Sequence, residues 1–492
     1  MATANRAANP KNARHGVIPS SLAEHLAVNS PAFAALPLRQ QAAIAVYIFN
    51  HDSKRYRHAE RDDAQCLFWE DLRRAFGRKW HEVNAALGGW FVLEDEHAPG
   101  KARAWKLSDD AYALLERWAF GDFILCRLID FEGQPMRKPR TAISPMTADG
   151  KSKSRFRGLP VQAYIPIDGD NLFRLIKACH AWQQGLPAPQ GFEWAYADWN
   201  DREAAAGRRK AAPRVRDVLL TAARMLHFAA ASPGKGFAVP VTYAEAESGR
   251  LYPNGFSLAG CVREVKRAAL RGCWEYDGEN MHWQLLYKLA KRAAKARGES
   301  IELPEIERYL QTKTPYRKAM ALSTGLISAY GREQGIAKAK EVLLALIFGA
   351  SVKSEDPKAR IPEIVGLEHL PALRQAVKPL CTDMNKARRL VLAHYRDTSR
   401  KVHRSDKLVN DAGRTFSPEA GESNLEAKEL AHILQGLESE ILRACIEYAG
   451  ESVVLLQHDG FATTTRLDMA GLQSAIQEAT RGLLIDMDEK QL

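Results

Sequence analysis

Hydrophobic and polar positions group into short blocks along this chain, and one block near the C-terminus is especially informative. Residues 453–456 are four consecutive apolar positions, Gln-His-Asp-Gly follows at 457–460, and β-prone residues resume at 461–463. Two apolar runs separated by a turn sequence predict a β-hairpin. We therefore expect a hairpin over 453–463 whose turn presents Asp459, either as an ordinary surface turn or as part of a charged site.

A second aspartate has a similar setting. Asp277 follows the β-prone residues 274–276 and precedes a glycine. Two carboxylates at strand ends, far apart in sequence, are able to bind a pair of Mg²⁺ ions about 4 Å apart, which stabilise both the attacking and the leaving oxygen in phosphoryl transfer. The pair of Asp277 and Asp459 therefore indicates a two-metal site for phosphoryl transfer.

Helical periodicity dominates the first part of the chain. Apolar residues recur at helical spacing in three segments, residues 38–49, 65–76 and 80–87. A hairpin pattern follows, with apolar strands at 90–94 and 102–107, and Ser108 predicts the N-cap of a further helix that runs through Trp118. Three helices followed by a hairpin resemble a winged-helix module.

Winged-helix modules often place a helix in the major groove of DNA and the hairpin, or wing, against the phosphate backbone. The wing expected here has a basic tip, so Lys101 and Arg103 are the candidate nucleic-acid contacts of this domain. The same fold also serves protein–protein binding, which stays open as the alternative.

Polar and basic positions mark the next region, which has several prolines and seven Lys or Arg residues between positions 137 and 157. This composition predicts a linker, either a solvated loop or a segment that follows a phosphate backbone. Beyond it the pattern predicts a strand over 161–167, a helix over 171–182 and a basic helical stretch over about 199–231.

From residue 242 onward, short motifs follow one another in an order that resembles family A DNA polymerases, the bacterial polymerase-I type. Ser-Gly-Arg-Leu at 248–251 is similar to the Ser/Thr-Gly-Arg-Leu turn of that family, and Asp277 lies 27 residues after Arg250 (277 − 250), where the first catalytic aspartate is expected. The resemblance implies that Arg250, Arg263 and Arg267 contact the backbone of a primer–template duplex.

The fingers helix of that family carries a lysine for the incoming triphosphate and, eight residues later, an aromatic residue followed by glycine. Lys340 and Phe348-Gly349 match this spacing (348 − 340 = 8), and the residues between them are helical in pattern. The resemblance implies that these residues bind the nucleotide. A rival register uses Tyr330-Gly331, with Arg317 or Lys318 upstream.

The segment before the hairpin also resembles the family. Gln435-Gly436 is similar to the start of the Gln-Gly-x-x-Ala-Asp-Ile helix, and the resemblance implies that Gln435 reads the minor groove and that His458 contacts nucleic acid. It further implies that Asp277, Asp459 and the backbone carbonyl of Gly278 hold two Mg²⁺ ions, for which Mn²⁺ can substitute. The hairpin is equally similar to that of single-subunit phage-type RNA polymerases.

The chain departs from the family pattern at four positions that the family fills with Gln, Arg, Asn and Glu. These positions are Ala259, Ile336, Ala431 and Gly460. With Ile336 in place of the arginine of the fingers helix, Arg332 or Lys338 is the candidate substitute. The family's third carboxylate is missing at Gly460.

One further position bears on the choice of sugar. Five residues after its catalytic aspartate, family A places a bulky Glu against the 2′ position, whereas RNA polymerases of this palm place Gly. The residue here is His282 (277 + 5). Because an imidazole fills the same space, we expect His282 to contact the nucleotide and deoxynucleotides to be favoured.

Composition supports a polyanionic partner. The formal net charge is +11, with 70 Lys and Arg against 59 Asp and Glu, and the pI is about 9.2. A basic balance of this kind favours nucleic acid as the partner. The first acidic residue is Glu24, so the N-terminus is expected to be a basic disordered arm, with a transit peptide as the alternative.

Membrane and redox signals are weak. The longest apolar run, residues 342–348, is too short to span a bilayer. Seven cysteines without a Cys-x-x-Cys motif or a Cys/His cluster predict reduced thiols rather than disulfides or a zinc site. The expected location is therefore cytoplasmic, in a bacterial or phage-infected cell, with an organelle as the alternative.

These observations predict an α+β chain with a right-hand polymerase architecture and a reaction of templated nucleotidyl transfer. The expected regions are a basic arm over 1–35, a winged-helix-like domain over 36–120, a basic linker over 121–160, a helical thumb-like region over 161–241, and palm and fingers over 242–492. No stretch resembles a proofreading exonuclease. The expected partners are DNA primer–template and nucleoside triphosphates, without a membrane.

Two other functions stay open. One is a single-subunit RNA polymerase or primase with the same palm. The other is a replication initiator that binds DNA through a palm without catalytic activity. Primer extension separates these functions, because an initiator gives sequence-specific DNA shifts and no extension.

Overall fold

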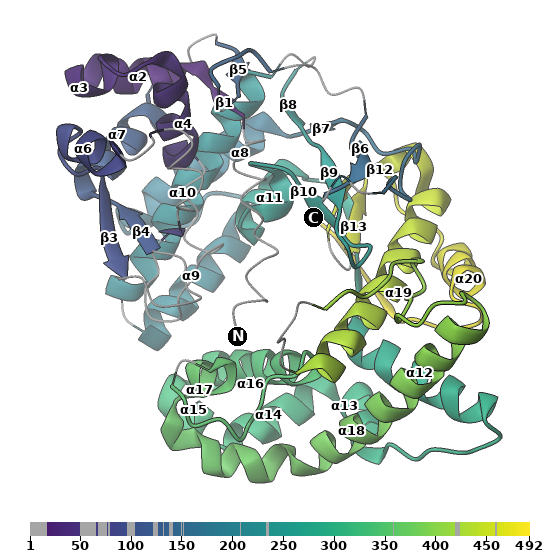
Figure 1. Cartoon of the computed structure of the whole chain (residues 1–492). Helices are drawn as coiled ribbons and strands as arrows, with labels where there is room; N and C mark the ends of the chain where they lie inside the picture. The colour runs from purple at the N-terminus through teal and green to yellow at the C-terminus, as the bar shows by residue number, and fades with distance from the viewer. Residues whose placement is uncertain are drawn as a thin grey trace.

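The computed structural model is a mixed α+β chain, as the sequence predicts. It describes residues 17–49, 65–66, 76, 79–95, 104–121, 126–130, 132–136, 141–148, 150, 152–206, 208–232, 236–357, 359–418, 424–457 and 460–492. Figure 1 shows two groups of helices with short β-strands between them, one group from the N-terminal half and one from the C-terminal half.

The N-terminal group begins with short helices around one core. These helices are α2 (Ser20–Asn29), α3 (Pro31–Ala34), α4 (Leu38–Phe49), α6 (Trp80–Ala86) and α7 (Asp109–Ala119). The expected hairpin forms from β3 (Phe91–Asp95) and β4 (Ala104–Leu107), which pair antiparallel. Ser108 caps α7 as predicted, since its hydroxyl oxygen accepts a hydrogen bond from the Ala111 backbone N–H at 3.3 Å.

One helix expected in this group does not start where the sequence pattern places it. Gln65 and Cys66 form strand β2 (Gln65–Cys66), which pairs antiparallel with β4. Pairing with β4 satisfies the backbone polar groups of these residues, and that tertiary contact outweighs the helical periodicity. Residues 67–75, and the tip of the hairpin with Lys101 and Arg103, lie outside the described residues.

The middle of the chain joins this group to the rest. Part of the expected linker is built into the fold, because β5 (Leu128–Ile129) pairs with β1 (Ile18–Pro19) and β6 (Ile143–Thr147) runs parallel to β9 (Tyr243–Glu245). Further strands and helices follow: β7 (Tyr164–Pro166), α8 (Gly169–Gln183), α9 (Glu193–Ala206), α10 (Arg208–Ala230), β8 (Ala238–Pro240), β10 (Leu251–Pro253) and α11 (Arg263–Ala269).

Aromatic packing connects the N-terminal group to the middle of the chain. The ring of Phe49, at the end of α4, lies 5.9 Å from that of Phe228 in α10 and 4.9 Å from that of Phe256. Arg224 of α10 also donates a hydrogen bond to the Phe49 carbonyl oxygen at 2.6 Å. The N-terminal helices are therefore packed into the same core as α10.

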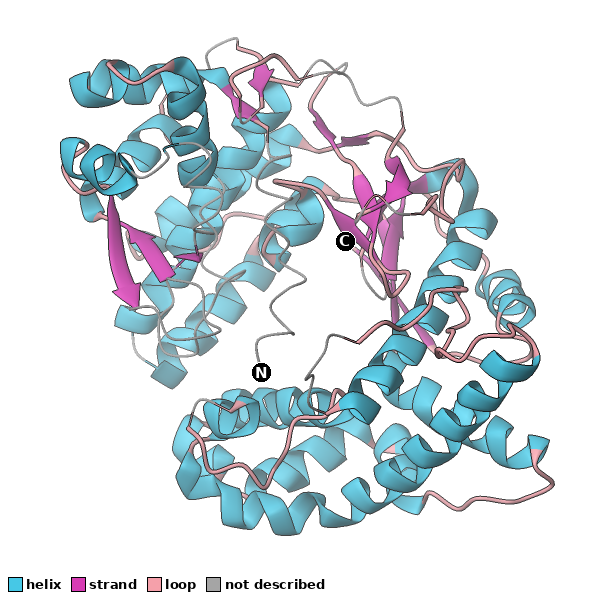
Figure 2. Cartoon of the chain, viewed as in Figure 1, coloured by secondary structure: helices cyan, strands magenta, loops and turns pink. Residues whose placement is uncertain are grey.

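A four-stranded antiparallel sheet forms the centre of the C-terminal half, with strand order β12-β13-β11-β14. Its strands are β11 (Trp274–Gly278), β12 (Val453–Leu456), β13 (Gly460–Thr463) and β14 (Met487–Gln491). The hairpin predicted over 453–463 is thus confirmed, and its strand β13 lies directly beside β11. Figure 2 shows these strands between the helical groups.

Helices make up most of the remaining C-terminal half. They are α12 (Met281–Ala296), α13 (Pro304–Gln311), α14 (Lys313–Ser323), α15 (Leu326–Tyr330), α16 (Arg332–Ile347), α17 (Arg360–Val365), α18 (Leu370–Lys401), α19 (Leu425–Ala449) and α20 (Met469–Ala479). In Figure 1, α13 to α18 lie together on one side of the sheet region. None of the described helices combines the length and apolar character that a membrane crossing requires.

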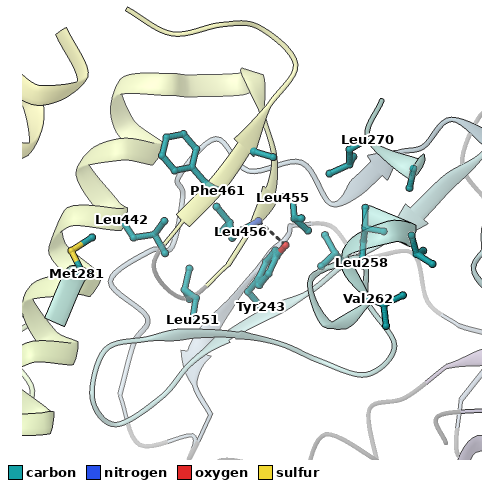
Figure 3. Packing of buried hydrophobic residues seen from close by; sticks show 14 of the residues in the cluster. Tyr243, Leu251, Leu258, Val262, Leu270, Met281, Leu442, Leu455, Leu456 and Phe461 are labelled. Atoms are coloured by element: carbon teal, nitrogen blue, oxygen red, sulfur yellow. Dashed lines mark hydrogen bonds between the residues drawn. The ribbon is translucent and has the colours of Figure 1, made fainter. Parts of the chain in front are cut away.

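The core beneath the hairpin is tightly closed. Tyr243, Leu251, Leu258 and Leu455 are buried around Leu456, and Figure 3 shows their side chains together. The Tyr243 hydroxyl accepts a hydrogen bond from the Leu456 backbone N–H at 3.1 Å. This bond anchors β12 from the side opposite β13, and burial raises the pKa of Tyr243, so the phenol stays neutral.

Candidate active site

Strand β11 carries Asp277 in the middle of the four-stranded sheet. Side chains alternate between the two faces of a strand, and here Tyr276 is buried while Asp277 is exposed. The Tyr276 ring stacks on that of Phe461 in β13 at 5.1 Å. Asp277 is therefore held at a fixed position on the opposite face by a buried aromatic pair.

The hairpin turn lies next to Asp277. Gly460 is the register partner of Asp277 in the β11–β13 ladder, and the Gln457 backbone N–H donates a hydrogen bond to the Gly460 carbonyl oxygen at 2.8 Å. His458 and Asp459 lie outside the described residues, but both of their flanking residues are fixed. The residue that directly follows Asp459 thus stands opposite Asp277.

The close approach of these strands explains why the residue after Asp459 is glycine. A Cβ at Gly460 would lie 2.4 Å from the Tyr276 carbonyl oxygen and 3.2 Å from Oδ1 of Asp277. Such distances leave no room for any side chain. A glutamate at this position would not fit without separating β13 from β11.

A chain of polar contacts crosses the sheet beside Asp277. Lys266 Nζ donates to Gln457 Oε1 at 2.7 Å, and Gln457 Nε2 donates to Glu275 Oε1 at 2.6 Å. Lys490 of β14 lies 2.7 Å from the other oxygen of Glu275. Burial alone would raise the pKa of Glu275, but its hydrogen bonds and the nearby lysines lower it, so the group is ionised. Asp488 stands opposite Asp277 in β14.

The turn between β11 and α12 has an unusual backbone. Asn280 has a φ of 47°, a left-handed conformation that asparagine tolerates better than most residues. A Cβ at Gly278 would lie 2.1 Å from Cε of Met281 and 3.2 Å from its Cβ, so a larger residue there would require the Met281 side chain to move. Strained positions of this kind cluster at functional sites.

Residues of α13 and α14 contact this turn. Oδ1 of Asn280 accepts hydrogen bonds from the Tyr309 hydroxyl, at 3.1 Å, and from Arg317 of α14. Lys313, at the start of α14, forms an ion pair with Glu279. Arg317, one of the two basic residues of the rival register, therefore touches the turn that follows Asp277.

Residues of the favoured register lie on α16 and at its end. Lys340 is exposed, two turns before Phe348. The Phe348 ring lies 4.9 Å from the ring of His282, edge to face. Gly349 has a φ of +86°, and a Cβ there would lie 2.3 Å from Cβ of Ala427 in α19, which explains the glycine. Phe348 and His282 therefore lie side by side, and their contact with a nucleotide stays a prediction.

His282 is buried on α12, five residues after Asp277, and makes two polar contacts. Its Nε2 lies 2.7 Å from Oε2 of Glu438 in α19 and 2.9 Å from Nη2 of Arg250. Arg250 Nη2 also donates to the same Glu438 oxygen at 2.5 Å. Three residues from separate parts of the chain therefore form one buried polar cluster.

The charges in this cluster support one another. Burial alone would raise the pKa of Glu438, but the positive charge of Arg250 and the contact with His282 hold it below its ordinary value. Burial alone would likewise lower the pKa of Arg250, and Glu438 raises it instead. Arg250 and Glu438 are therefore both charged. Because the side chain of Arg250 is only 12% exposed, its predicted contact with a phosphate backbone stays a prediction.

The other predicted nucleic-acid contacts lie on two helices. Arg263 of α11 is 63% exposed and lies 3.1 Å from Asp198 of α9. Arg267 lies over the Trp194 ring at 4.4 Å, and burial lowers its pKa. Gln435 of α19 is partly exposed. Their contacts with nucleic acid stay predictions.

Glu438 is the residue that sequence reasoning missed. It lies in a stretch of α19 where nearly every side chain is buried, and its own side chain is 0% exposed. The available signal was a pair of acids, Glu438 and Glu440, within a stretch of the helix that is otherwise largely apolar. The pattern alone does not reveal its partners, because Arg250 and His282 come from distant segments.

Comparisons with known proteins place few limits on this site. No protein-family model matches the sequence, and no curated protein matches it. Among solved structures, the chain aligns with one described as the POL domain of Pol1 from M. smegmatis in complex with DNA primer-template and dNTP. That alignment has a TM-score of 0.39 at 13% identity and covers 67% of each chain, and we draw no conclusion from it.

Proposed function

We propose that this chain is a template-directed nucleotidyltransferase whose reaction centre is formed by Asp277 and Asp459. The observation that carries this proposal is the register of the central sheet, in which Asp277 pairs with Gly460, the residue after Asp459. The register brings the strand that follows Asp459 in the chain directly beside the strand that carries Asp277, which supports the proposal. A DNA polymerase is the specific activity that we propose.

The donor chemistry fits divalent metal ions. Carboxylate oxygens are the ligands that Mg²⁺ prefers, and Asp277 is exposed at the sheet face. Among the described residues, no group of three His, Cys, Asp or Glu side chains is placed to hold a metal. In this proposal Asp459 is the second carboxylate ligand. When bound, Mg²⁺ supplies charge stabilisation for the phosphate oxygens.

The side chains around Asp277 are suited to hold a nucleotide beside it. In this proposal Phe348 and His282 contact the base and sugar. His282 lies five residues after Asp277 in the chain, and its ring is in contact with the ring of Phe348. The exposed amine of Lys340 neutralises the triphosphate. Arg317, at the turn after Asp277, is the second cation available to phosphate oxygens.

The N-terminal group is proposed to bind duplex DNA. It combines helices with a three-stranded antiparallel sheet in the order β2-β4-β3, so the wing is supported by a third strand. The wing tip carries Lys101 and Arg103 in the sequence, which suits contact with phosphates.

Primer extension tests the proposal. A labelled primer annealed to a DNA template is incubated with Mg²⁺ and each set of nucleotides, using the wild type, Asp277→Asn and the control Glu478→Gln. Glu478 is an exposed acid on α20. We expect Asp277→Asn to lose at least about a hundredfold in rate, the scale seen when charge stabilisation of a transition state is removed. The control should retain the wild-type rate.

The outcomes separate the candidate functions. Extension by Asp277→Asn at a near-normal rate contradicts the assigned site. Preference for ribonucleotides together with chain starts without a primer would favour the RNA polymerase or primase alternative. A wild type that extends no primer but shifts a specific DNA sequence would favour the initiator.

A further inference from the structure

A buried carboxylate stands beside the ring that is proposed to contact the sugar. The Glu438 side chain is 0% exposed, and its Oε2 lies 2.7 Å from Nε2 of His282. Its other oxygen, Oε1, has no hydrogen-bond partner within the described part of the chain. A buried carboxylate with a hydrogen bond to only one of its oxygens lowers the stability of the fold. Its presence therefore needs an explanation other than packing.

Stability does not provide that explanation. Replacing a buried ion pair with apolar residues of similar volume is often neutral or stabilising. Arg250 and Glu438 form such a pair, and Nε of Arg250 likewise has no partner among the described residues. Arg250 and Glu438 both contact the imidazole of His282, and together they fix its position.

The cluster holds His282 in either tautomer. If Nε2 carries the proton, it donates to Glu438 at 2.7 Å, and if it does not, it accepts from Arg250 at 2.9 Å. The ring also packs against Phe348, whose ring lies 4.9 Å away at an interplanar angle of 67°. The imidazole therefore has little freedom to swing away from the position that α12 gives it.

We propose that Glu438 is a positioning residue that determines sugar selectivity by fixing the imidazole of His282 beside the nucleotide site. This inference rests on the proposed polymerase function. If the ring is held rigidly, it excludes a 2′-hydroxyl, and if it is released, it can move aside and admit one. Loss of Glu438 should therefore weaken discrimination against ribonucleotides.

The experiment measures kcat/KM for a deoxynucleotide and for the matching ribonucleotide on one primed template. Glu438→Gln keeps the shape of the side chain but removes its charge. We expect the deoxy-to-ribo ratio of kcat/KM to fall by at least about tenfold, through a lower KM for the ribonucleotide. Glu429→Gln is the matched control, since Glu429 is another acid of α19 that is nearly buried and paired with an arginine, Arg396, at 2.5 Å.

A double-mutant cycle separates positioning from general damage. His282→Gly should lower the same ratio, and adding Glu438→Gln to it should lower the ratio no further, because the ring that Glu438 positions is gone. If Glu438→Gln fails to fold, the pair Arg250→Met with Glu438→Leu removes the same anchor with apolar residues. That pair should show the same loss of selectivity.

An unchanged ratio in Glu438→Gln, or additive effects in the cycle, would overturn the inference while leaving the polymerase function intact. An equal loss for both sugars, with a lower Tm, would assign Glu438 to structure alone. Absence of extension by the wild type would overturn the proposed function itself, and this inference with it.

Discussion

Gly460 offers the sharpest test of the geometry around Asp277. A Cβ added at this position would lie 2.4 Å from the Tyr276 carbonyl oxygen. Because an ordinary carbon–oxygen contact is about 3.3–3.6 Å, Gly460→Ala requires the two strands to separate by about 1 Å. The obstructing atoms belong to the backbone of β11, which pairs on both sides, so they cannot move aside as a flexible side chain would.

The magnitude follows from two opposing effects. Overpacking of this kind lowers the free energy of unfolding by about 1–3 kcal/mol. Replacing glycine with alanine also raises it by about 0.4–1 kcal/mol, because alanine restricts the conformations of the unfolded chain. We expect the free energy of unfolding to fall by about 1–2 kcal/mol. For a cooperative unit of 150–250 residues, each kcal/mol lowers Tm by about 2–4 °C, so the expected decrease is about 2–8 °C.

Thermal melts followed by circular dichroism provide the assay. Thr464→Ala serves as the control, because Thr464 is exposed directly after β13. Primer extension by Gly460→Ala should also be slower, since a shift of β13 moves Asp459 relative to Asp277. A Tm for Gly460→Ala equal to that of the control would refute the close approach of the two strands.

Two further predictions follow from particular contacts. Tyr276→Phe should lower the free energy of unfolding by about 1–3 kcal/mol, because the Leu467 N–H, which donates to the Tyr276 hydroxyl at 2.7 Å, is left without that acceptor; thermal melts measure the loss. Substituting both Lys101 and Arg103 with Ala in the full chain should weaken duplex binding at low salt, with a difference that shrinks as salt rises. Equal affinity at low salt would instead indicate a protein-binding module.

The sequence predicted elements well where local signals and tertiary contacts agree. The helix expected over 38–49 is found at Leu38–Phe49, with its second half buried. The hairpin over 453–463 forms as expected, since its apolar runs are buried on both strands. In both cases the continuous apolar runs are the buried residues.

The sequence did not predict the strands that form only by pairing with segments far away in the chain. Strand β14 is polar, with Asp488 and Lys490 exposed, so its sequence has no strand signal, and pairing with β11 alone defines it. The strand at Gln65–Cys66 depends in the same way on β4. The partners of Arg250 were equally hidden, because Glu438 is 188 residues away in the chain.

The identity of residue 282 is linked to that of residue 438. A glutamate at position 282 would place a second carboxylate beside the buried Oε2 of Glu438, which now lies 2.7 Å from the His282 ring. Two carboxylates that close repel, so one would have to take up a proton. An imidazole avoids that conflict, since it can donate a hydrogen bond to Glu438 and still fill the space of a bulky side chain. A histidine at position 282 is therefore compatible with the buried acid on α19, and the two positions are best understood as one unit.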